Sequence, residues 1–284
     1  MIQPLRQIKR RIRTVENTKK ITRAMEIISV AKLRPLQNRL LRAKEYFLKV
    51  EGVLNHCLAS FADVPHPLLE EREKKAKVSV CLITSDTGLC GSYNNDLIDS
   101  VEAMFLPGAD KKVSLFAVGR KGFSHFKRSA FEIFDAYTEM HGRYSLEITD
   151  KIARILMDRF LSGEADEVYV AYTYFDSAAR RRPVVEKFLN IPRVKSQDVL
   201  YLVEPDIKAF LEDFLPLCLS VKMRFMMLNA LAAEHSARGL AMREASDNAT
   251  EMFEELILLR NKVRQTTITK EIIEVISSAD ALKG

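Results

Sequence analysis

The loop from Ser85 to Gly91 carries the residue types that come closest to catalytic or ligand-binding chemistry. It reads Ser-Asp-Thr-Gly-Leu-Cys-Gly and follows an apolar run, Val78 to Thr84, that is typical of a buried strand. A loop between a strand and a helix can hold phosphate through its backbone N–H groups. However, Gly88 and Gly91 do not fit the GxGxxG spacing, and no Gly-Lys-Ser or Gly-Lys-Thr follows. The spacing therefore disfavours nucleotide binding.

Two catalytic interpretations of the same loop lack the partner residues that they need. Residues 86–88 form the Asp-Thr-Gly motif of an aspartic protease, whose paired carboxylates share a proton, but no second copy occurs. Cys90 needs a histidine base to act as a nucleophile, and the nearest in sequence, His66 and His125, form no recognisable motif. We interpret Cys90 as a buried structural thiol. Because no acid, base, nucleophile and metal set occurs together, the chain is predicted to be non-catalytic.

The remaining cysteines, histidines and arginines also indicate structure rather than chemistry. His56 and His235 lie on predicted helices and are interpreted as packed or solvated side chains, not ligands. The Arg180–Arg182 run is interpreted as a solvated turn rather than a phosphate contact. Without a CxxC pair or nearby histidines, the cysteines are expected to be reduced intracellular thiols, and neither a cofactor nor a metal is predicted. The four cysteines are Cys57, Cys81, Cys90 and Cys218.

Positive charge is concentrated at the start of the chain. The 284 residues carry a formal charge of +6, yet residues 1–50 hold 14 Lys or Arg against three acids, an excess of +11. Such a segment suits an anionic partner, which can be nucleic acid, a membrane surface or an acidic protein. The basic residues are spread along the segment without an aromatic platform, which disfavours nucleic acid. Neither a signal-peptide h-region nor a run of about 18 apolar residues is found, so any membrane association is expected to be peripheral.

Residues 1–61 are predicted to form one long helix, because the chain has only 10 Gly and 9 Pro and its apolar residues recur at helical spacing here. At about 1.5 Å per residue it would be about 80 to 90 Å long. From Leu36 onward the apolar steps alternate between four and three, which is a heptad seam. Pro35 removes one helical hydrogen bond, so we predict a bend or break near residues 31–35. Before the break, the predicted seam positions include Ile21, Met25 and Ile28.

A charged linker at residues 62–76 leads into a predicted Rossmann-like α/β domain at residues 76–205. Apolar β-rich runs alternate there with helical runs, which predicts a mainly parallel sheet. The predicted strands are 78–84, 113–118, 131–136 and 168–175, with peripheral strands at 184–189 and 199–203, and the predicted helices are 96–104, 121–127 and 146–161.

Residues 206–284 are predicted to form a second long helix, with Pro216 splitting off a short first piece. The helix would be about 100 Å long. It holds 10 basic and 12 acidic residues, a net charge of −2, whereas residues 1–50 are strongly basic. Opposite charge on flanking positions pairs the helices of a coiled coil. We therefore predict an α/β protein with long helices, in which residues 1–61 and 206–284 form an antiparallel coiled coil and the α/β domain is inserted between them.

Three separated segments carry a specific pattern. The first lies at 8–33 and includes Thr-Lys-Lys-Ile-Thr-Arg-Ala-Met-Glu at 18–26. The second is Ser-Asp-Thr-Gly-Leu-Cys-Gly-Ser-Tyr-Asn-Asn at 85–95, and the third, at 234–276, includes Ala-Met-Arg-Glu-Ala-Ser-Asp-Asn-Ala at 241–249 and Asn-Lys-Val-Arg-Gln-Thr-Thr-Ile-Thr-Lys-Glu at 261–271. In this order they resemble the gamma subunit of the F-type ATP synthases. Thr87, where that family often has a basic residue, and Pro35 in the shaft helix indicate a divergent member.

The resemblance implies a non-catalytic rotor subunit of the central stalk. Such a subunit couples proton or sodium flow through a membrane c-ring to ATP synthesis or hydrolysis in a hexamer of alpha and beta subunits, and the epsilon subunit is a further partner. The resemblance implies contacts of Met25 with the lever loop of a catalytic subunit, of Arg264, Gln265 and Thr269 with its catch loop, and of Tyr201 and Glu204 with the c-ring. It also implies a peripheral position on the cytoplasmic side of a bacterial plasma membrane, since the helix starts at Met1 without a transit peptide. The alternative is a coiled-coil adaptor whose α/β domain binds a ligand or another protein.

Overall fold

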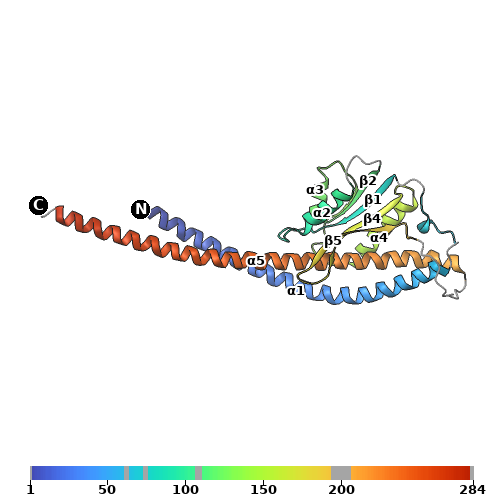
Figure 1. Ribbon diagram of the computed structural model, residues 1–284, viewed down its shortest axis with the longest axis horizontal. Coiled ribbons are helices and arrows are strands. Elements are labelled where there is room, and N and C mark those ends of the chain that lie inside the picture. Colours follow the sequence, from blue (N-terminus) through green and yellow to red (C-terminus); the bar gives the residue numbers. More distant parts are fainter. Residues whose placement is uncertain (1, 61–63, 73–75, 106–110, 193–205, 282–284) are drawn as a thin grey trace. The chain divides into compact units, whose positions relative to one another are not determined.

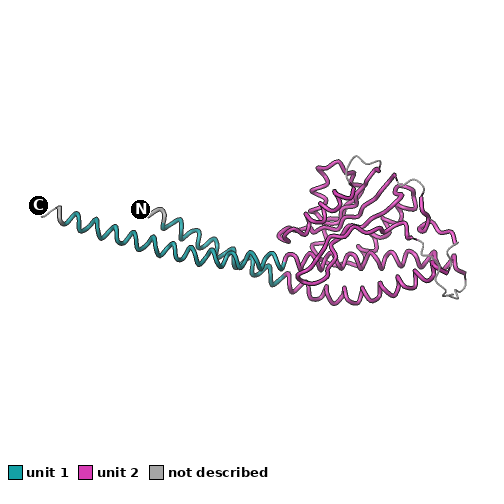
Figure 2. Tube along the Cα trace, in the orientation of Figure 1, with its two compact units in different colours: residues 1–28, 239–284 teal, residues 29–238 magenta. Residues whose placement is uncertain are grey.

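The computed structural model describes residues 2–60, 64–72, 76–105, 111–192 and 206–281. The chain forms two compact units, one made of residues 1–28 and 239–284 and the other of residues 29–238 (Figure 2). Two helices, α1 (Ile2–Ser60) and α5 (Ile207–Ala281), contribute residues to both units. The α/β fold class predicted from the sequence is confirmed: a sheet with its own helices is inserted between the two long helices (Figure 1).

Within the described residues, the sheet has five strands in the order β3-β2-β1-β4-β5. The neighbours β1–β2, β1–β4 and β2–β3 are parallel, and only β5 runs antiparallel to its neighbour, β4. Central strand β1 is buried at every position after Lys77, which explains why its sequence is a continuous apolar run instead of an alternation. The peripheral strand predicted at 199–203 lies outside the described residues. The strands are β1 (Lys77–Ile83), β2 (Lys112–Val118), β3 (Glu132–Tyr137), β4 (Glu167–Phe175) and β5 (Arg181–Leu189).

Helices cover both faces of the sheet. On one face, α2 (Tyr93–Met104) and α3 (Arg120–Phe126) pack through Leu97 and Phe126 onto β1 and β2. On the other face, α4 (Leu146–Leu161) joins the 29–60 part of α1 and the 207–238 part of α5 in a single larger core. A short 3-10 turn, η1 (Pro67–Leu69), closes the edge of this core with two buried leucines. The α/β domain is therefore anchored on the paired long helices.

Of the predicted bend or break at Pro35, the break is wrong, because α1 is helical on both sides of Pro35 and through it. The bend stays a prediction. Pro35 is exposed, so its ring faces solvent, while Leu33 and Leu36 on either side are buried in the core. Their burial outweighs the hydrogen bond that proline removes. Pro216 likewise lies inside α5 and does not split off a first helix, since Leu215 and Leu219 are both buried.

The seam of α1 also differs from the prediction. Ile21 and Ile28 are 60% and 55% exposed, whereas Thr22, Glu26 and Ser29 are buried. Steps of four and three therefore continue without a shift along the whole helix, and polar residues fill the seam in its middle. The inward positions are 8, 12, 15, 19, 22, 26, 29, 33, 36, 40, 43, 47, 50, 54 and 57.

The helix pair is antiparallel in each unit. In the 1–28/239–284 unit, residue 26 pairs with residue 243, and residues 10–15 lie beside 252–256. In the 29–238 unit, the Phe47 and Phe225 rings stack with centroids 4.8 Å apart. Contrary to the sequence analysis, α5 does contain an 18-residue window apolar and long enough to cross a membrane. That window is 67% buried inside the protein, as in a core helix.

Candidate functional site

Met25 lies on the 1–28/239–284 unit beside a strip of exposed apolar side chains. It is half-buried, and Ile21 and Ile28, which lie four residues before and three residues after it on the same helix face, are each more than half exposed. These isoleucines lie outside the seam, because in this part of α1 the heptad places Thr22, Glu26 and Ser29 at the inward positions. Apolar side chains clustered on a basic helix present a surface suited to a protein partner.

Directly next to Met25, the buried Glu26 carboxylate ties the two helices together. Its Oε2 accepts from Arg23 Nη1 at 2.6 Å, and its Oε1 accepts from Arg243 Nε on α5 at 3.1 Å. Burial alone would raise the pKa of Glu26, but hydrogen bonds from Arg243 and Arg23 outweigh burial and lower it. The sequence analysis did not predict this buried carboxylate. Two features of the sequence point to it: Glu26 falls on the unshifted heptad, and it is one of only three acids in residues 1–50.

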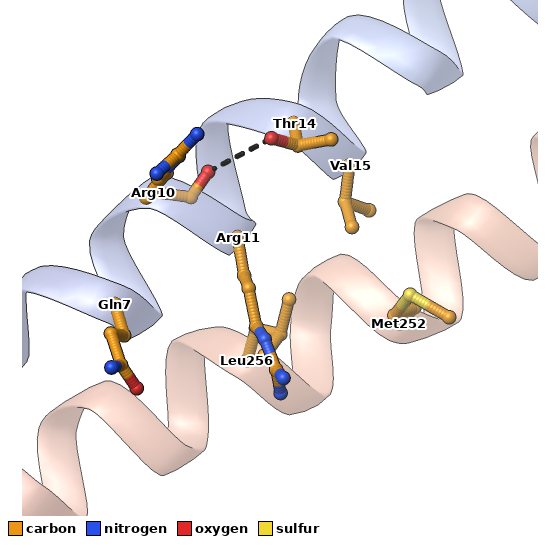
Figure 3. A pocket seen from close by; sticks show the side chains of 7 residues that line it. All are labelled: Gln7, Arg10, Arg11, Thr14, Val15, Met252 and Leu256. Carbon is orange, nitrogen blue, oxygen red and sulfur yellow. Dashed lines mark hydrogen bonds between the residues drawn. The ribbon is translucent and has the colours of Figure 1, made fainter. Parts of the chain in front are cut away.

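Further toward the chain ends, the two helices leave a cleft of about 770 Å³ between them. Arg11 extends from α1 toward Leu256, and Val15 faces Met252 across the gap (Figure 3). Arg10 lies on the same stretch of α1, where its backbone carbonyl accepts from the Thr14 hydroxyl at 3.1 Å. The cleft thus combines an apolar floor with the Arg11 guanidinium, a group suited to carboxylate ligands.

Arg264, Gln265 and Thr269 are exposed on the last third of α5. Gln265 and Thr269 are four residues apart and so share a helix face, and the Thr269 hydroxyl donates to the Gln265 carbonyl at 3.0 Å. The Arg264 and Gln265 side chains are therefore available to an external partner. Tyr201 and Glu204, predicted to touch a membrane ring, lie outside the described residues.

Beyond Leu256, α5 exposes apolar side chains on several sides. Each of them is at least 44% exposed, although isoleucine and leucine are usually buried. Such a helix end gains stability when an apolar surface encloses it. The exposed apolar residues are Leu258, Leu259, Ile268, Ile272, Ile273, Val275 and Ile276.

The 85–91 loop has a structural role, as predicted. Asp86 accepts from the Arg120 N–H at 3.0 Å and from the His141 N–H at 2.6 Å, and Arg238 of α5 donates to the Thr87 carbonyl and hydroxyl. Cys90 is buried, and burial raises its pKa, so the thiol is neutral and unreactive. The loop is thus fixed on α5 by hydrogen bonds.

The other candidate groups for catalysis are not brought together. His66 accepts from the Leu68 N–H through Nδ1, and His125 pairs with Glu102 at 2.8 Å on the far side of the sheet. Burial raises the pKa of Cys218 to about 12. Arg180 lies in the exposed turn before β5, as predicted. The prediction is wrong for Arg181 and Arg182, which belong to β5 itself, where Arg182 pairs with Asp176 at 3.6 Å. Among residues whose side chains the structure describes, no three His, Cys, Asp or Glu groups gather in a way that could hold a metal ion.

Comparison with known proteins places this arrangement in a family. Residues 4–282 match the family model described as ATP synthase. The chain is 41% identical over 281 residues to the ATP synthase gamma chain of Moorella thermoacetica, covering 98% of this chain and 99% of that protein. It is 35% identical over 283 residues to the ATP synthase gamma chain of Protochlamydia amoebophila, with the same coverage.

Solved structures share the fold. A chain of the Euglena gracilis mitochondrial ATP synthase, in a structure of its OSCP, F1 and c-ring in rotational state 3, superposes with a TM-score of 0.71. The match covers 99% of this chain and 95% of that chain at 15% sequence identity. A chain from the central stalk and c-ring structure of the Tetrahymena thermophila mitochondrial ATP synthase matches with a TM-score of 0.61 over 80% of this chain and 99% of that one, at 21% identity.

Proposed function

Since this chain belongs to the ATP synthase gamma chain family, we propose that it is the central-stalk rotor subunit of an F-type ATP synthase. In this role it couples ion flow through a membrane ring to ATP synthesis or hydrolysis in a hexamer of alpha and beta subunits. In this proposed role the catalytic chemistry belongs to other subunits. The proposal is supported by His66, His125 and Asp86, which lie apart and are engaged in structural bonds.

The observation that carries the proposal is the contrast in burial along α5. Between Leu211 and Ala237 most of its apolar residues are buried with the α/β domain, and from Met252 to Ile276 they are largely exposed. A helix anchored at one end and apolar but uncovered at the other is suited to insertion into a sleeve formed by other subunits. The heptad seam supplies the stiffness that torque transmission requires.

Three residue groups are proposed to meet the hexamer. Met25, with the exposed isoleucines around it, would pass the acidic lever loop of a catalytic subunit, where the basic α1 provides charge complementarity. Arg264 and Gln265 would hydrogen-bond to a catch loop, with Thr269 one turn further along α5. Because hydrogen bonds are directional, these bonds would hold the rotor at one rotation angle. Apolar contacts elsewhere are not directional and would let the rotor turn past its partner subunits.

Tyr201 and Glu204 are proposed to meet the membrane ring, with the epsilon subunit as a further partner. We propose, in keeping with such contacts, that the chain is a peripheral subunit on the cytoplasmic side of a bacterial plasma membrane. The burial of the apolar window in α5 agrees with a peripheral position, because that window serves the protein core.

Reconstitution tests the proposal directly. The full chain is combined with its alpha and beta subunits, and a bead is attached through Ala103→Cys on α2. Ala103 is exposed, and the four natural cysteines are buried, so labelling is selective. We expect a complex that hydrolyses ATP and turns the bead in one direction. A chain that binds neither subunit, or a complex that hydrolyses ATP without rotation, overturns the rotor assignment.

A further inference from the structure

The turn from Met140 to Arg143, here the 140–143 turn, is held against α5 by an unusual contact. Its two central residues have positive φ angles, 49° at His141 and 66° at Gly142, and the Arg143 N–H donates to the Met140 carbonyl at 2.9 Å. This is the geometry of a type I′ turn, which glycine adopts freely and histidine adopts at a cost. External contacts must therefore favour it.

Three contacts hold the turn in place. The His141 N–H donates to Asp86 at 2.6 Å, the Met140 side chain is buried, and the Gly142 carbonyl accepts from His235 Nε2 at 3.0 Å. The backbone lies so close to the imidazole that a Cβ at residue 142 would come within 2.9 Å of Nε2. His235 is thus the support on α5 on which the turn rests.

The His235 contact fixes the tautomer of the neutral ring. A carbonyl oxygen only accepts, so Nε2 carries the hydrogen and Nδ1 of the neutral ring is bare. Nδ1 is buried, and no group in the described part of the chain forms a hydrogen bond with it. A proton added at Nδ1 would therefore create a buried N–H without an acceptor and a buried positive charge.

The surroundings offer that charge little compensation. Arg238 on α5 and Lys32 on α1 are both positive and act on His235. Glu234 is the nearest acid, but it already pairs with Arg238 at 2.8 Å. Burial lowers the pKa of His235, the Gly142 carbonyl opposes this, and the charges of Arg238 and Lys32 lower the pKa further. The titratable or charged groups around the contact are Glu234 and Arg238 on α5, Lys32 on α1, Asp86 after β1, Tyr93 on α2 and His141 in the turn.

We propose that the 140–143 turn is a pH-operated latch between the sheet and α5, which opens when His235 takes up a proton and its Nδ1 must reach water. The turn lies between β3 and the Ser145 cap of α4, so its release loosens one attachment of the α/β domain to the long helix. The latch depends only on the 29–238 unit, and it holds whether or not the chain acts as a rotor.

The sign of the effect follows from proton linkage. The unfolded histidine has a pKa of about 6.5, and the closed native state has a lower one. The closed turn is therefore fully stable above pH 6.5 and is destabilised as the pH falls from there to the native pKa. In that window the population of the open turn rises by up to about tenfold per pH unit.

Hydrogen exchange of the full chain between pH 5.5 and 7.5 tests the latch, with rates corrected for intrinsic exchange. The reporters are the amides of His141 and Arg143, both hydrogen-bonded in the closed turn. In the wild type, we expect their protection to fall as the pH falls below 6.5. His235→Gln keeps an N–H that can donate to the Gly142 carbonyl but does not titrate, so its protection should be flat. His125→Gln, an exposed histidine on α3, should respond to pH as the wild type does.

Two results overturn the latch. One is a wild type whose turn stays equally protected across the range. The other is an equal fall in His235→Gln, which keeps Asp86, Glu234 and His141 and would assign the effect to one of them. If His235→Gln does not fold, nitrogen NMR of the wild-type imidazoles decides. The latch requires the Nε2–H tautomer and a midpoint below 6.5 that coincides with turn opening, and a midpoint at or above 6.5 rejects it.

Discussion

At the residue scale, the least expected feature is a buried carboxylate in the seam of a basic helix. The Glu26 side chain is 6% exposed, whereas the side chains of its two arginine partners are each 61% exposed. The arginines cover the carboxylate while keeping much of their own surface in water, which limits the cost of burying charge. A polar group at one seam position also disfavours pairing of the two helices in a shifted register, because the shift would separate the group from its partners.

Replacing Glu26 by Gln should lower the free energy of unfolding by about 1 kcal/mol, because the partners are solvent-screened. Denaturation followed by helical circular dichroism measures the loss. Glu16→Gln, which breaks an exposed pair with Lys20, should have a smaller effect. The native pKa of Glu26 is lowered, so its contribution is complete above the unfolded value of 4.5 and is lost as the pH falls through the native pKa. Equal losses in both variants would show that burial of Glu26 is irrelevant.

The double variant Arg264→Ala, Gln265→Ala should reduce ATP hydrolysis by the reconstituted complex about tenfold, which corresponds to about 1.4 kcal/mol of lost charge-assisted hydrogen bonding. Both side chains are exposed, so the helicity of the free chain should not change. Lys262→Ala with Thr266→Ala removes a matched pair of exposed side chains nearby and serves as the control. Full activity and normal assembly of the Arg264/Gln265 variant would remove these residues from the functional set.

At the scale of elements, patterns within one segment and the antiparallel pairing of the two long helices could be predicted from the sequence. Individual contacts between residues far apart in the chain could not. The run from Val78 to Thr84 identified β1 because a central parallel strand is apolar on both faces. The inward positions Thr22, Glu26 and Ser29 were missed because hydrophobic periodicity does not register polar residues. The contact of His235 with Gly142 joins residues 93 positions apart and leaves no local pattern. The break predicted at Pro35 failed for a different reason. The lost hydrogen bond is visible in the local sequence, but the burial of Leu33 and Leu36 that outweighs it comes from the tertiary structure.

Pro35→Ala should stabilise the chain by about 1 to 2 kcal/mol. The new N–H can donate to the Ala31 carbonyl, which recovers part of the roughly 3 kcal/mol that proline costs inside a helix. The unfolded chain gains conformational entropy when proline is removed, and this lowers the gain in stability by about 0.4 to 1 kcal/mol. Because Pro35 is exposed, little packing is lost. Denaturant midpoints compare it with Arg34→Ala, an exposed neighbour that changes no backbone hydrogen bond. A destabilised Pro35→Ala would indicate that the curvature imposed by proline is needed for packing in the 29–238 unit.

At the scale of the whole molecule, the two compact units bury their residues differently. The 29–238 unit has large apolar cores on both faces of its sheet. The 1–28/239–284 unit has a narrow seam with Glu26 and Ser246 buried in it, and it exposes most of its isoleucines. Apolar surface left in water is an unfavourable arrangement for a chain that acts alone. The 1–28/239–284 unit is therefore suited to being completed by other subunits.

The triple variant Ile272→Ser, Ile273→Ser, Ile276→Ser tests whether other subunits cover the exposed end of α5. These side chains are 53%, 56% and 55% exposed, so the free chain should unfold at nearly the same denaturant concentration as the wild type. Its affinity for the alpha and beta subunits should fall at least about tenfold, because each isoleucine contributes about 1.5 to 3 kcal/mol on full burial. Titration of the labelled chain into the subunits measures the affinity, and Leu161→Ser on α4, 49% exposed, is the control. If binding is unchanged, the exposed end of α5 is not enclosed by these subunits, and the contacts that hold the chain in the complex must lie on α1 or on the α/β domain.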